Sequence, residues 1–426
     1  MAWSFLSLLT ILCIGILLRG LIVRGAFYHF PFLAAATFLT FVLPQLPGLV
    51  NTPFVSDSSI SKVLFFSCLC LAMCGVGWSV GVHGHRPRDH YFSEARLLHV
   101  AAALSLVGAF FFYKFGHLPD DQRLRGMHTG AAVAYLFFAK LLTYGLAIAL
   151  ICYAQRMSKF ALAIILFDSV FYLERIFIAG KRGETAEFFL LFALAFWFQR
   201  RWAVPRPVVV ASILLSGVAM LGVEEYRLAT LYNSKPDWSA VMNIDLARNW
   251  DRMLEQGGPE MRNATMAIEQ IDRTRRFDFG IEHWNSVVFA FVPAQLVGQS
   301  FKASLGIKTS SAVFERGYDP SLGSTATGMT DAFASFWYFG CLKFFVIAWA
   351  LGLIYSAAAH GNTTMQITYM LSAIPAMLAI THFTNEIVIA WIHMAAFLVP
   401  ALYYARVHST GTSISALPTT SHYRTA

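Results

Sequence analysis

Long apolar runs separated by short polar segments recur along most of the chain. Each run is close to the roughly 20 predominantly apolar residues that a helix needs to cross the hydrocarbon core of a bilayer. The pattern predicts spans at 3–23, 26–50, 60–83, 95–115, 129–153, 158–178, 184–199, 206–224, 331–356, 364–382 and 386–405. We therefore expect an all-α polytopic membrane protein with about eleven transmembrane helices.

One long polar segment, 225–330, interrupts this pattern. It separates an N-terminal bundle of about eight helices, 1–224, from about three C-terminal helices in 331–405. The Ser/Thr-rich tail, 406–426, cannot bury a core, so we expect it to be disordered.

The polar segment contains helical signals of its own. Apolar residues spaced three and four apart predict an amphipathic helix over 238–256, and a second helix is expected over 260–276. Residues 284–300 are apolar but are interrupted by Pro293, which favours an interfacial or re-entrant segment over a full span.

The composition excludes a soluble protein of this length. Hydrophobic residues make up 57% of the chain and charged residues 13%, whereas a soluble domain has about 25% charged residues. So few charges could not cover the surfaces of soluble domains.

The net charge of +8 is informative only when it is divided by side of the membrane. If Arg200, Arg201 and Arg206 are cytoplasmic, alternation of the spans also places Arg156 and the C-terminal tail inside. This arrangement follows the positive-inside rule. It predicts an N-terminus and a 225–330 segment outside and a C-terminus in the cytoplasm.

Charged residues inside a span point to pairing or to a wet cavity, because they are costly in lipid. Asp168, Tyr172 and Arg175 share one face of the sixth predicted helix, and Lys140 lies within the fifth. Either Asp168 forms a structural pair with Arg175 or Lys140, or these residues line a cavity for a charged substrate group.

A short cationic turn follows, with Lys181 and Arg182 between Gly180 and Gly183 and with Glu184 next. Glycine lets the backbone approach an anion closely, and arginine and lysine both bind phosphate. The turn is therefore either a phosphate cradle or an interfacial basic anchor.

The polar segment contains a second charged group: Arg273, Arg275, Arg276, Glu282, His283 and, further on, Arg316. These residues form either a solvated face or part of a site. A histidine can act as a general base near neutral pH. Groups of carboxylates, histidines and cysteines at metal-ligand spacing are absent from the sequence, so we expect no metal and no cofactor.

These features resemble the bacterial oligosaccharide repeat-unit polymerases, the Wzy-type O-antigen polymerases. The likeness is carried by residues 179–184 (AGKRGE), by the Pro293 stretch, and by residues 323–331 (GSTATGMTD) running into 332–340 (AFASFWYFG). The acidic residue here is Asp331, where the family more often has glutamate. The matched region covers about 180–355, and the first 130 residues match only in hydropathy.

The resemblance implies a GT-C-like membrane glycosyltransferase of the bacterial inner membrane. Such an enzyme moves a glycan from undecaprenyl pyrophosphate onto the end sugar of a second lipid-linked repeat unit, at the outer face. A chain-length regulator is an implied partner, besides the bilayer and the lipid-linked glycan, and nucleic acid is not.

The resemblance also suggests roles for the charged residues. Arg182, Lys181 and Arg175 would bind pyrophosphate, and Arg273, Arg275, Arg276 and Arg316 would contact anions or glycan. The base would be Asp331, Glu282 or His283. An O-antigen ligase shares the long external loop and is the nearest alternative. A transporter or flippase is the alternative from another class, although we find no repeat symmetry of the kind that transporters show.

Overall fold

The computed structural model describes residues 1–50, 55–84, 91–119, 130–231, 236–308 and 324–407. Within these ranges the regular structure is helical, apart from one isolated bridge between Phe92 and Arg406. Eight described segments are long and apolar enough to cross a membrane. The expectation of an all-helical, multi-pass membrane protein is therefore confirmed.

The eight segments coincide with eight of the predicted spans. They are α1 (Ala2–Ile22), the broken helix Phe30–Val50, α4 (Asp57–Gly81), α5 (Glu94–Gly116), α7 with α8 (Ala131–Gln155), α19 to α20 (Thr327–Ala359), α21 (Thr363–Thr381) and α22 (Asn385–Ala405). Helices also occupy the other three predicted positions: α9 (Lys159–Phe177), α10 (Arg182–Arg200) and α11 (Arg206–Leu221). Helices α9 and α10 carry more charged residues, and α11 has only 16 residues.

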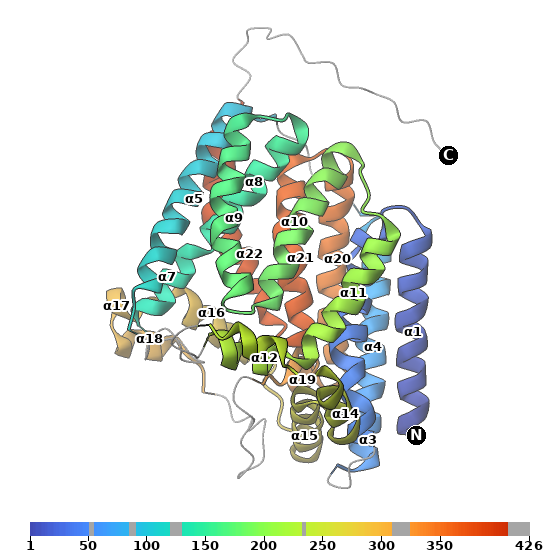
Figure 1. Cartoon of the computed structure of the whole chain (residues 1–426). Coiled ribbons are helices and arrows are strands. Elements are labelled where there is room, and N and C mark those ends of the chain that lie inside the picture. Colours follow the sequence, from blue (N-terminus) through green and yellow to red (C-terminus); the bar gives the residue numbers. More distant parts are fainter. Residues whose placement is uncertain (51–54, 85–90, 120–129, 232–235, 309–323, 408–426) are drawn as a thin grey trace.

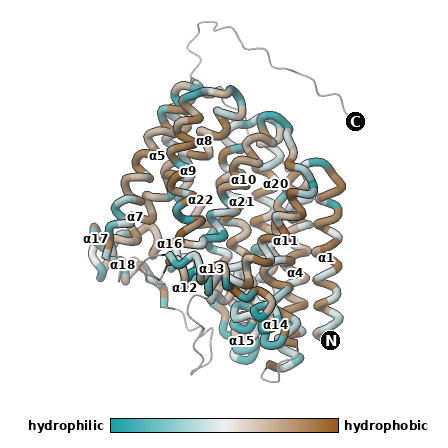
Figure 2. Tube along the Cα trace, viewed as in Figure 1, coloured by the Kyte–Doolittle hydropathy of each residue, from teal (hydrophilic) through white to brown (hydrophobic). Residues whose placement is uncertain are grey.

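The long helices run side by side and divide the molecule into two ends (Figure 1). The N-terminus and helices α12 to α19 lie at one end, and α22 ends at the other. Hydrophobic residues line the long helices, whereas hydrophilic residues gather on α12 to α15 and at the helix ends (Figure 2). We call the end that carries α12 to α19 the loop end.

Three spans are interrupted, where the sequence pattern predicts continuous helices. Phe30–Val50 is divided into α2 (Phe30–Thr37), a π-helical turn η2 (Phe38–Val42), a 3-10 turn η3 (Leu43–Gln45) and α3 (Leu46–Val50). Pro44 and Pro47 account for the irregular second half, since proline cannot donate a backbone hydrogen bond. Helices α7 (Ala131–Ala139) and α8 (Leu141–Gln155) meet at Lys140.

The third interruption separates α19 (Thr327–Phe336) from α20 (Leu342–Ala359) by the 3-10 turn η4 (Trp337–Cys341). Helix α19 starts before residue 331, so part of the predicted external segment belongs to the membrane bundle.

The polar segment is folded into short helices. They are α12 (Val223–Thr230), α13 (Trp238–Met242), α14 (Leu246–Gln256), α15 (Pro259–Thr274), α16 (Ile281–Phe291), α17 (Ala294–Val297) and α18 (Gln299–Leu305). The single helix predicted over 238–256 is wrong, because Asp245 accepts a hydrogen bond from the Arg248 N–H at 3.0 Å and starts α14 as a new helix. The helix expected over 260–276 is confirmed as α15. The apolar stretch around Pro293 is broken, as expected, into α16, α17 and α18.

Glycines bring α4 and α20 into backbone contact. A Cβ at Gly77 would lie 2.2 Å from the Phe345 carbonyl oxygen, and a Cβ at Gly81 would lie 2.2 Å from the Trp349 carbonyl oxygen. Small residues four apart allow such close packing between membrane helices. Helix α4 therefore supports the span that begins with α19.

We expect Gly77→Ala to destabilise the protein by about 1–3 kcal/mol, because the new methyl group meets backbone that cannot easily shift. Thermal unfolding in detergent would measure this loss. Gly75→Ala is the matched control on the same helix, since a Cβ at Gly75 would have nothing within 4 Å. Equal unfolding temperatures for the two variants would contradict the close packing.

Candidate functional site

Four polar side chains from three parts of the chain meet at the loop end. We call this group the acid–base cluster. It consists of His283 of α16, Asp331 of α19, Lys343 of α20, and Thr384, which precedes α22. The Asp331 Oδ2 atom accepts hydrogen bonds from the Thr384 backbone N–H, at 2.9 Å, and from its hydroxyl. Lys343 Nζ lies 3.4 Å from Asp331 Oδ1 and 2.7 Å from Ser335 Oγ. Asp331 is only 9% exposed, so these donors satisfy a largely buried carboxylate.

The 2.9 Å hydrogen bond between His283 Nε2 and Thr384 favours a proton on Nε2, whereas Lys343 Nζ, which can only donate, lies farther from the same nitrogen, at 3.4 Å. The carboxylate of Asp331 only accepts, so the single hydroxyl proton of Thr384 is donated to it. Thr384 Oγ1 must then accept the 2.9 Å hydrogen bond from His283 Nε2. In this tautomer the neutral ring has its lone pair on Nδ1, a buried atom with no hydrogen-bond partner among the described residues.

The surroundings favour a neutral His283. Burial lowers the pKa of its imidazole, and the charge of Lys343 lowers it further, against the opposing effect of Asp331 and Asp278. Partial burial and the negative charges of Asp278 and Asp331 raise the pKa of Glu282. Of the three predicted catalytic residues, the structure thus brings His283 and Asp331 together, with Glu282 close enough to interact electrostatically.

A second group of cations surrounds the turn between α9 and α10. We call Arg175, Lys181, Arg182 and Arg227 the cationic cluster. Arg182 is the first residue of α10 and contacts Met220 of α11. Helix α12 covers the turn, since the Tyr226 hydroxyl donates to the Phe177 carbonyl at 2.6 Å. Lys181 and Arg182 both interact electrostatically with Arg227.

The three members of this predicted phosphate site differ in how available their charges are. Arg175 forms an ion pair with Glu184 and lies 5.6 Å from the Phe112 ring centroid, so its charge is already compensated. Lys181 is exposed and Arg182 is half-buried. Gly180 has a φ of +56°, which only glycine adopts without strain, and the ring of Tyr226 packs against it.

The turn between α21 and α22 links the two clusters. Thr384 belongs to the acid–base cluster, whereas His382, two residues earlier, interacts electrostatically with Arg182. His382 is exposed and is held by a 2.8 Å hydrogen bond between its Nδ1 and Thr381 Oγ1. The turn therefore carries one residue of the acid–base cluster and one that interacts with the cationic cluster.

Of the other predicted arginines, the three that the structure describes do not join either cluster. Arg273 is exposed and hydrogen-bonds Gln270 at 2.5 Å. Arg275 lies 3.1 Å from Asp272 Oδ1 and 4.6 Å from the centroid of the Trp337 ring. Arg276 is exposed at the end of α15, and Arg316 lies outside the described residues.

Three intramembrane residues have structural partners. Asp168 is fully buried and accepts a 2.8 Å hydrogen bond from Ser105, so the alternative in which it pairs with Arg175 or Lys140 is wrong. Its neighbour Tyr172 donates to Glu187 at 2.8 Å. His393 of α22 is buried, and its Nε2 hydrogen-bonds the Phe137 carbonyl at 3.0 Å.

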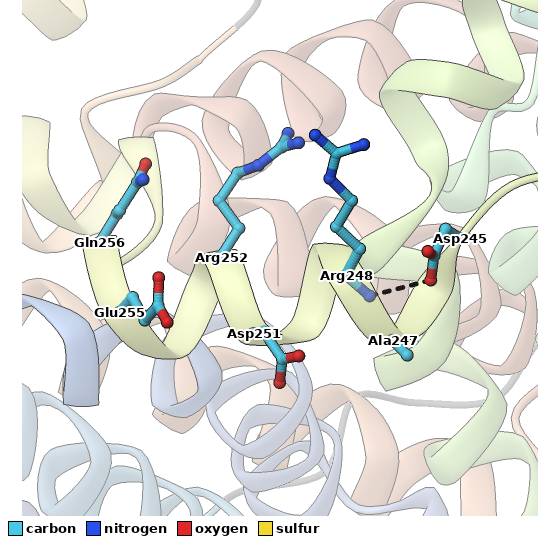
Figure 3. A pocket seen from close by; sticks show the side chains of 7 residues that line it. All are labelled: Asp245, Ala247, Arg248, Asp251, Arg252, Glu255 and Gln256. Atoms are coloured by element: carbon cyan, nitrogen blue, oxygen red, sulfur yellow. Dashed lines mark hydrogen bonds between the residues drawn. The ribbon is translucent and has the colours of Figure 1, made fainter.

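A surface hollow of about 460 Å³ lies along α14 and contains no predicted site residue. In Figure 3 its two arginines, Arg248 and Arg252, extend from the helix toward one another, while Asp251 and Glu255 point away from them. Its charges are mixed, and all its lining residues come from 245–256. We do not assign a site there.

Sequence reasoning missed three residues of the two clusters. Lys343 carried a detectable signal, because it is a charge in the middle of the apolar span 331–356, whose other charge, Asp331, stands at its start. Arg227 follows the eighth span, and Thr384 has no distinguishing pattern around it. Among the described residues, no group of three histidines, cysteines or acids is placed to hold a metal ion.

Comparisons with models of protein families, with curated proteins and with solved structures found no match to this chain.

Proposed function

We propose that the protein is a membrane glycosyltransferase that polymerises lipid-linked oligosaccharide repeat units. In this proposal the chain crosses the bacterial inner membrane eleven times in a GT-C-like arrangement. The loop end faces outward and the C-terminus faces the cytoplasm. Arg156, Arg200, Arg201 and Arg206 belong to the end opposite α12 to α19, which agrees with the positive-inside rule.

The observation that supports the proposal is the pairing of the two clusters at one end of an apolar bundle. The acid–base cluster provides a neutral histidine held by a hydroxyl and a carboxylate. The cationic cluster provides Lys181 and Arg182 at the start of α10, and Arg227 on the short helix α12. A lipid-linked diphosphate places its anion at this depth, with its glycan toward water.

The reaction assigned to the site transfers a glycan to a sugar hydroxyl. The hydroxyl oxygen of the acceptor forms a bond to the anomeric carbon of the donor glycan, and His283 Nδ1 accepts the hydroxyl proton. The bond between the anomeric carbon and the pyrophosphate oxygen breaks, and its electron pair leaves with the pyrophosphate. Lys181, Arg182 and Arg227 stabilise the charge that develops there.

Asp331 is better suited to orient His283 than to act as the base. Both of its oxygens already interact with Thr384 or Lys343, so an incoming hydroxyl would compete with these donors. Asp331 accepts a hydrogen bond from the Thr384 hydroxyl, so the Thr384 oxygen is left to accept the hydrogen bond from His283 Nε2. Because Nδ1 is covered by protein atoms, a substrate must displace neighbouring side chains to reach it.

Vesicles of defined orientation test both the activity and the side on which it occurs. Right-side-out membrane vesicles containing the protein should elongate externally added undecaprenyl-pyrophosphate repeat units into a ladder of lipid-linked polymers. Inverted vesicles should do so only after detergent opens them. Transfer to lipid A core without elongation would instead indicate a ligase, and movement of unchanged substrate across the bilayer would indicate a flippase.

A further inference from the structure

The chain reverses between α19 and α20 at a residue in an unfavourable conformation. Trp337 has φ +54° and ψ −138°, a region that side chains other than glycine rarely adopt. Three residues later, a Cβ at Gly340 would lie 1.9 Å from the Ala332 carbonyl oxygen, so η4 folds back against α19. The reversal is thus a feature that the surrounding contacts must maintain.

This reversal allows Asp331 and Lys343 to meet. In an uninterrupted helix, twelve residues would separate the two positions by about 18 Å along the axis. In the structure, Lys343 Nζ is 3.4 Å from Asp331 Oδ1. The acid–base cluster therefore depends on the backbone conformation at 336–341.

Trp337 contacts Asp272 and Arg275, and Lys62 forms an ion pair with Asp272. Its indole N–H donates to Asp272 Oδ1 at 3.2 Å, and Lys62 Nζ lies 2.5 Å from Asp272 Oδ2. Arg275 lies 3.1 Å from Asp272 Oδ1 and 4.6 Å from the Trp337 ring centroid. We call Lys62, Asp272, Arg275 and Trp337 the Asp272 clamp; it connects α4, α15 and η4.

We infer that the Asp272 clamp is a positioning device that maintains the reversal at Trp337 and so keeps Lys343 beside Asp331 and His283. An effect of the clamp on catalysis rests on the proposed function. Its effect on the position of Lys343 in the acid–base cluster does not rest on that function. Breaking the clamp would allow η4 to relax and Lys343 to withdraw from the cluster.

Withdrawal of Lys343 has a defined electrostatic consequence. The charged groups that act on His283 are Asp331 on α19, Asp278 before α16 and Lys343 on α20. Lys343 opposes protonation of the imidazole, and the two aspartates favour it. Without Lys343 nearby, the pKa of His283 rises toward neutrality.

Asp272→Asn in the full-length protein tests this inference. Histidine titrations can be followed by NMR of ¹⁵N-histidine-labelled protein in nanodiscs, with His283→Gln identifying the signal. We expect Asp272→Asn to raise the His283 midpoint and to lower turnover by about 10²-fold, the scale of an ångström-sized displacement. Asp245→Asn is the matched control, because it caps α14 and is not part of the clamp. An unchanged His283 midpoint in Asp272→Asn would overturn the inference.

A pair of Trp337 variants tests the strained conformation separately. Trp337→Ala and Trp337→Gly both remove the indole, but only glycine adopts the positive φ without cost. The glycine variant should therefore unfold at a higher temperature than the alanine variant. Ala334→Gly, inside α19, should instead lower the unfolding temperature, because alanine stabilises an ordinary helix more than glycine does. If Trp337→Ala unfolded at a higher temperature than Trp337→Gly, the backbone at Trp337 would not be strained, and no contacts would be needed to maintain the reversal.

The outcomes separate this inference from the proposed function. If the His283 midpoint moves but wild-type protein makes no polymer, the positioning role stands and the proposed glycosyltransferase fails. If wild-type protein makes polymer but the midpoint does not move, the clamp is only structural.

Discussion

His283→Gln should lower the rate of polymer elongation by about 10²–10⁴-fold, the usual cost of losing a general base. Glutamine can still donate a hydrogen bond to Thr384, so the hydroxyl and Asp331 keep a partner, but it cannot take up a proton. The initial rate with purified lipid-linked repeat units would measure the loss. His360→Gln is the matched control, because His360 bonds a carbonyl in its own helix at the opposite end.

The pH dependence provides an independent test of the same role. His283 has a pKa below the ordinary 6.5, so the neutral form that acts as a base dominates at neutral pH. The wild-type rate should fall only as the pH drops below about 6.5, and the residual rate of His283→Gln should lack this decrease. If Asp331→Asn costs more than His283→Gln and removes the acid limb, Asp331 is the base instead.

Arg182→Ala should be nearly inactive, and Arg182→Lys should keep only part of the activity. The arginine fork can bind two phosphate oxygens at once, whereas lysine offers one charged point. Polymer ladders in a complementation assay would show the effect, with membrane abundance measured beside them. An interfacial anchor predicts a different result, since alanine would then cost about 1 kcal/mol or less and lysine would replace arginine fully.

Arg24 offers a control of the same type, because it lies at the opposite end and hydrogen-bonds the Arg201 carbonyl at 3.3 Å. Arg24→Ala should leave the ladder unchanged. Wild-type ladders from Arg182→Ala at normal abundance would exclude a phosphate-binding role for Arg182.

Hydropathy was sufficient to locate the helices, because lipid requires long apolar segments whose backbone hydrogen bonds are internal. It could not reveal the interruptions at Lys140 and Trp337, which depend on tertiary contacts. Lysine and tryptophan are both ordinary helix residues, and at Trp337 the Asp272 clamp supplies partners from α4 and α15.

The site was only partly visible in the sequence. The family resemblance pointed to Asp331, the charged group of the polar segment pointed to His283, and the cationic turn between two glycines pointed to Arg182. Their grouping was not visible, because Thr384 joins the cluster through a turn between two late helices. The same limitation led to the wrong partner for Asp168, whose hydrogen bond comes from the uncharged Ser105 on α5.

The glycine contact between α4 and α20 has a consequence for the order in which the site is made. Helix α4 emerges early during synthesis, and α20 emerges after most of the chain has been translated. The acid–base cluster comes entirely from residues 283–384, yet the span with Asp331 and Lys343 packs on α4 through Gly77 and Gly81. A fragment beginning after α4 would contain every residue of that cluster but lack the helix against which Gly77 and Gly81 pack it. The site therefore depends on a helix that is synthesised long before the residues of the cluster.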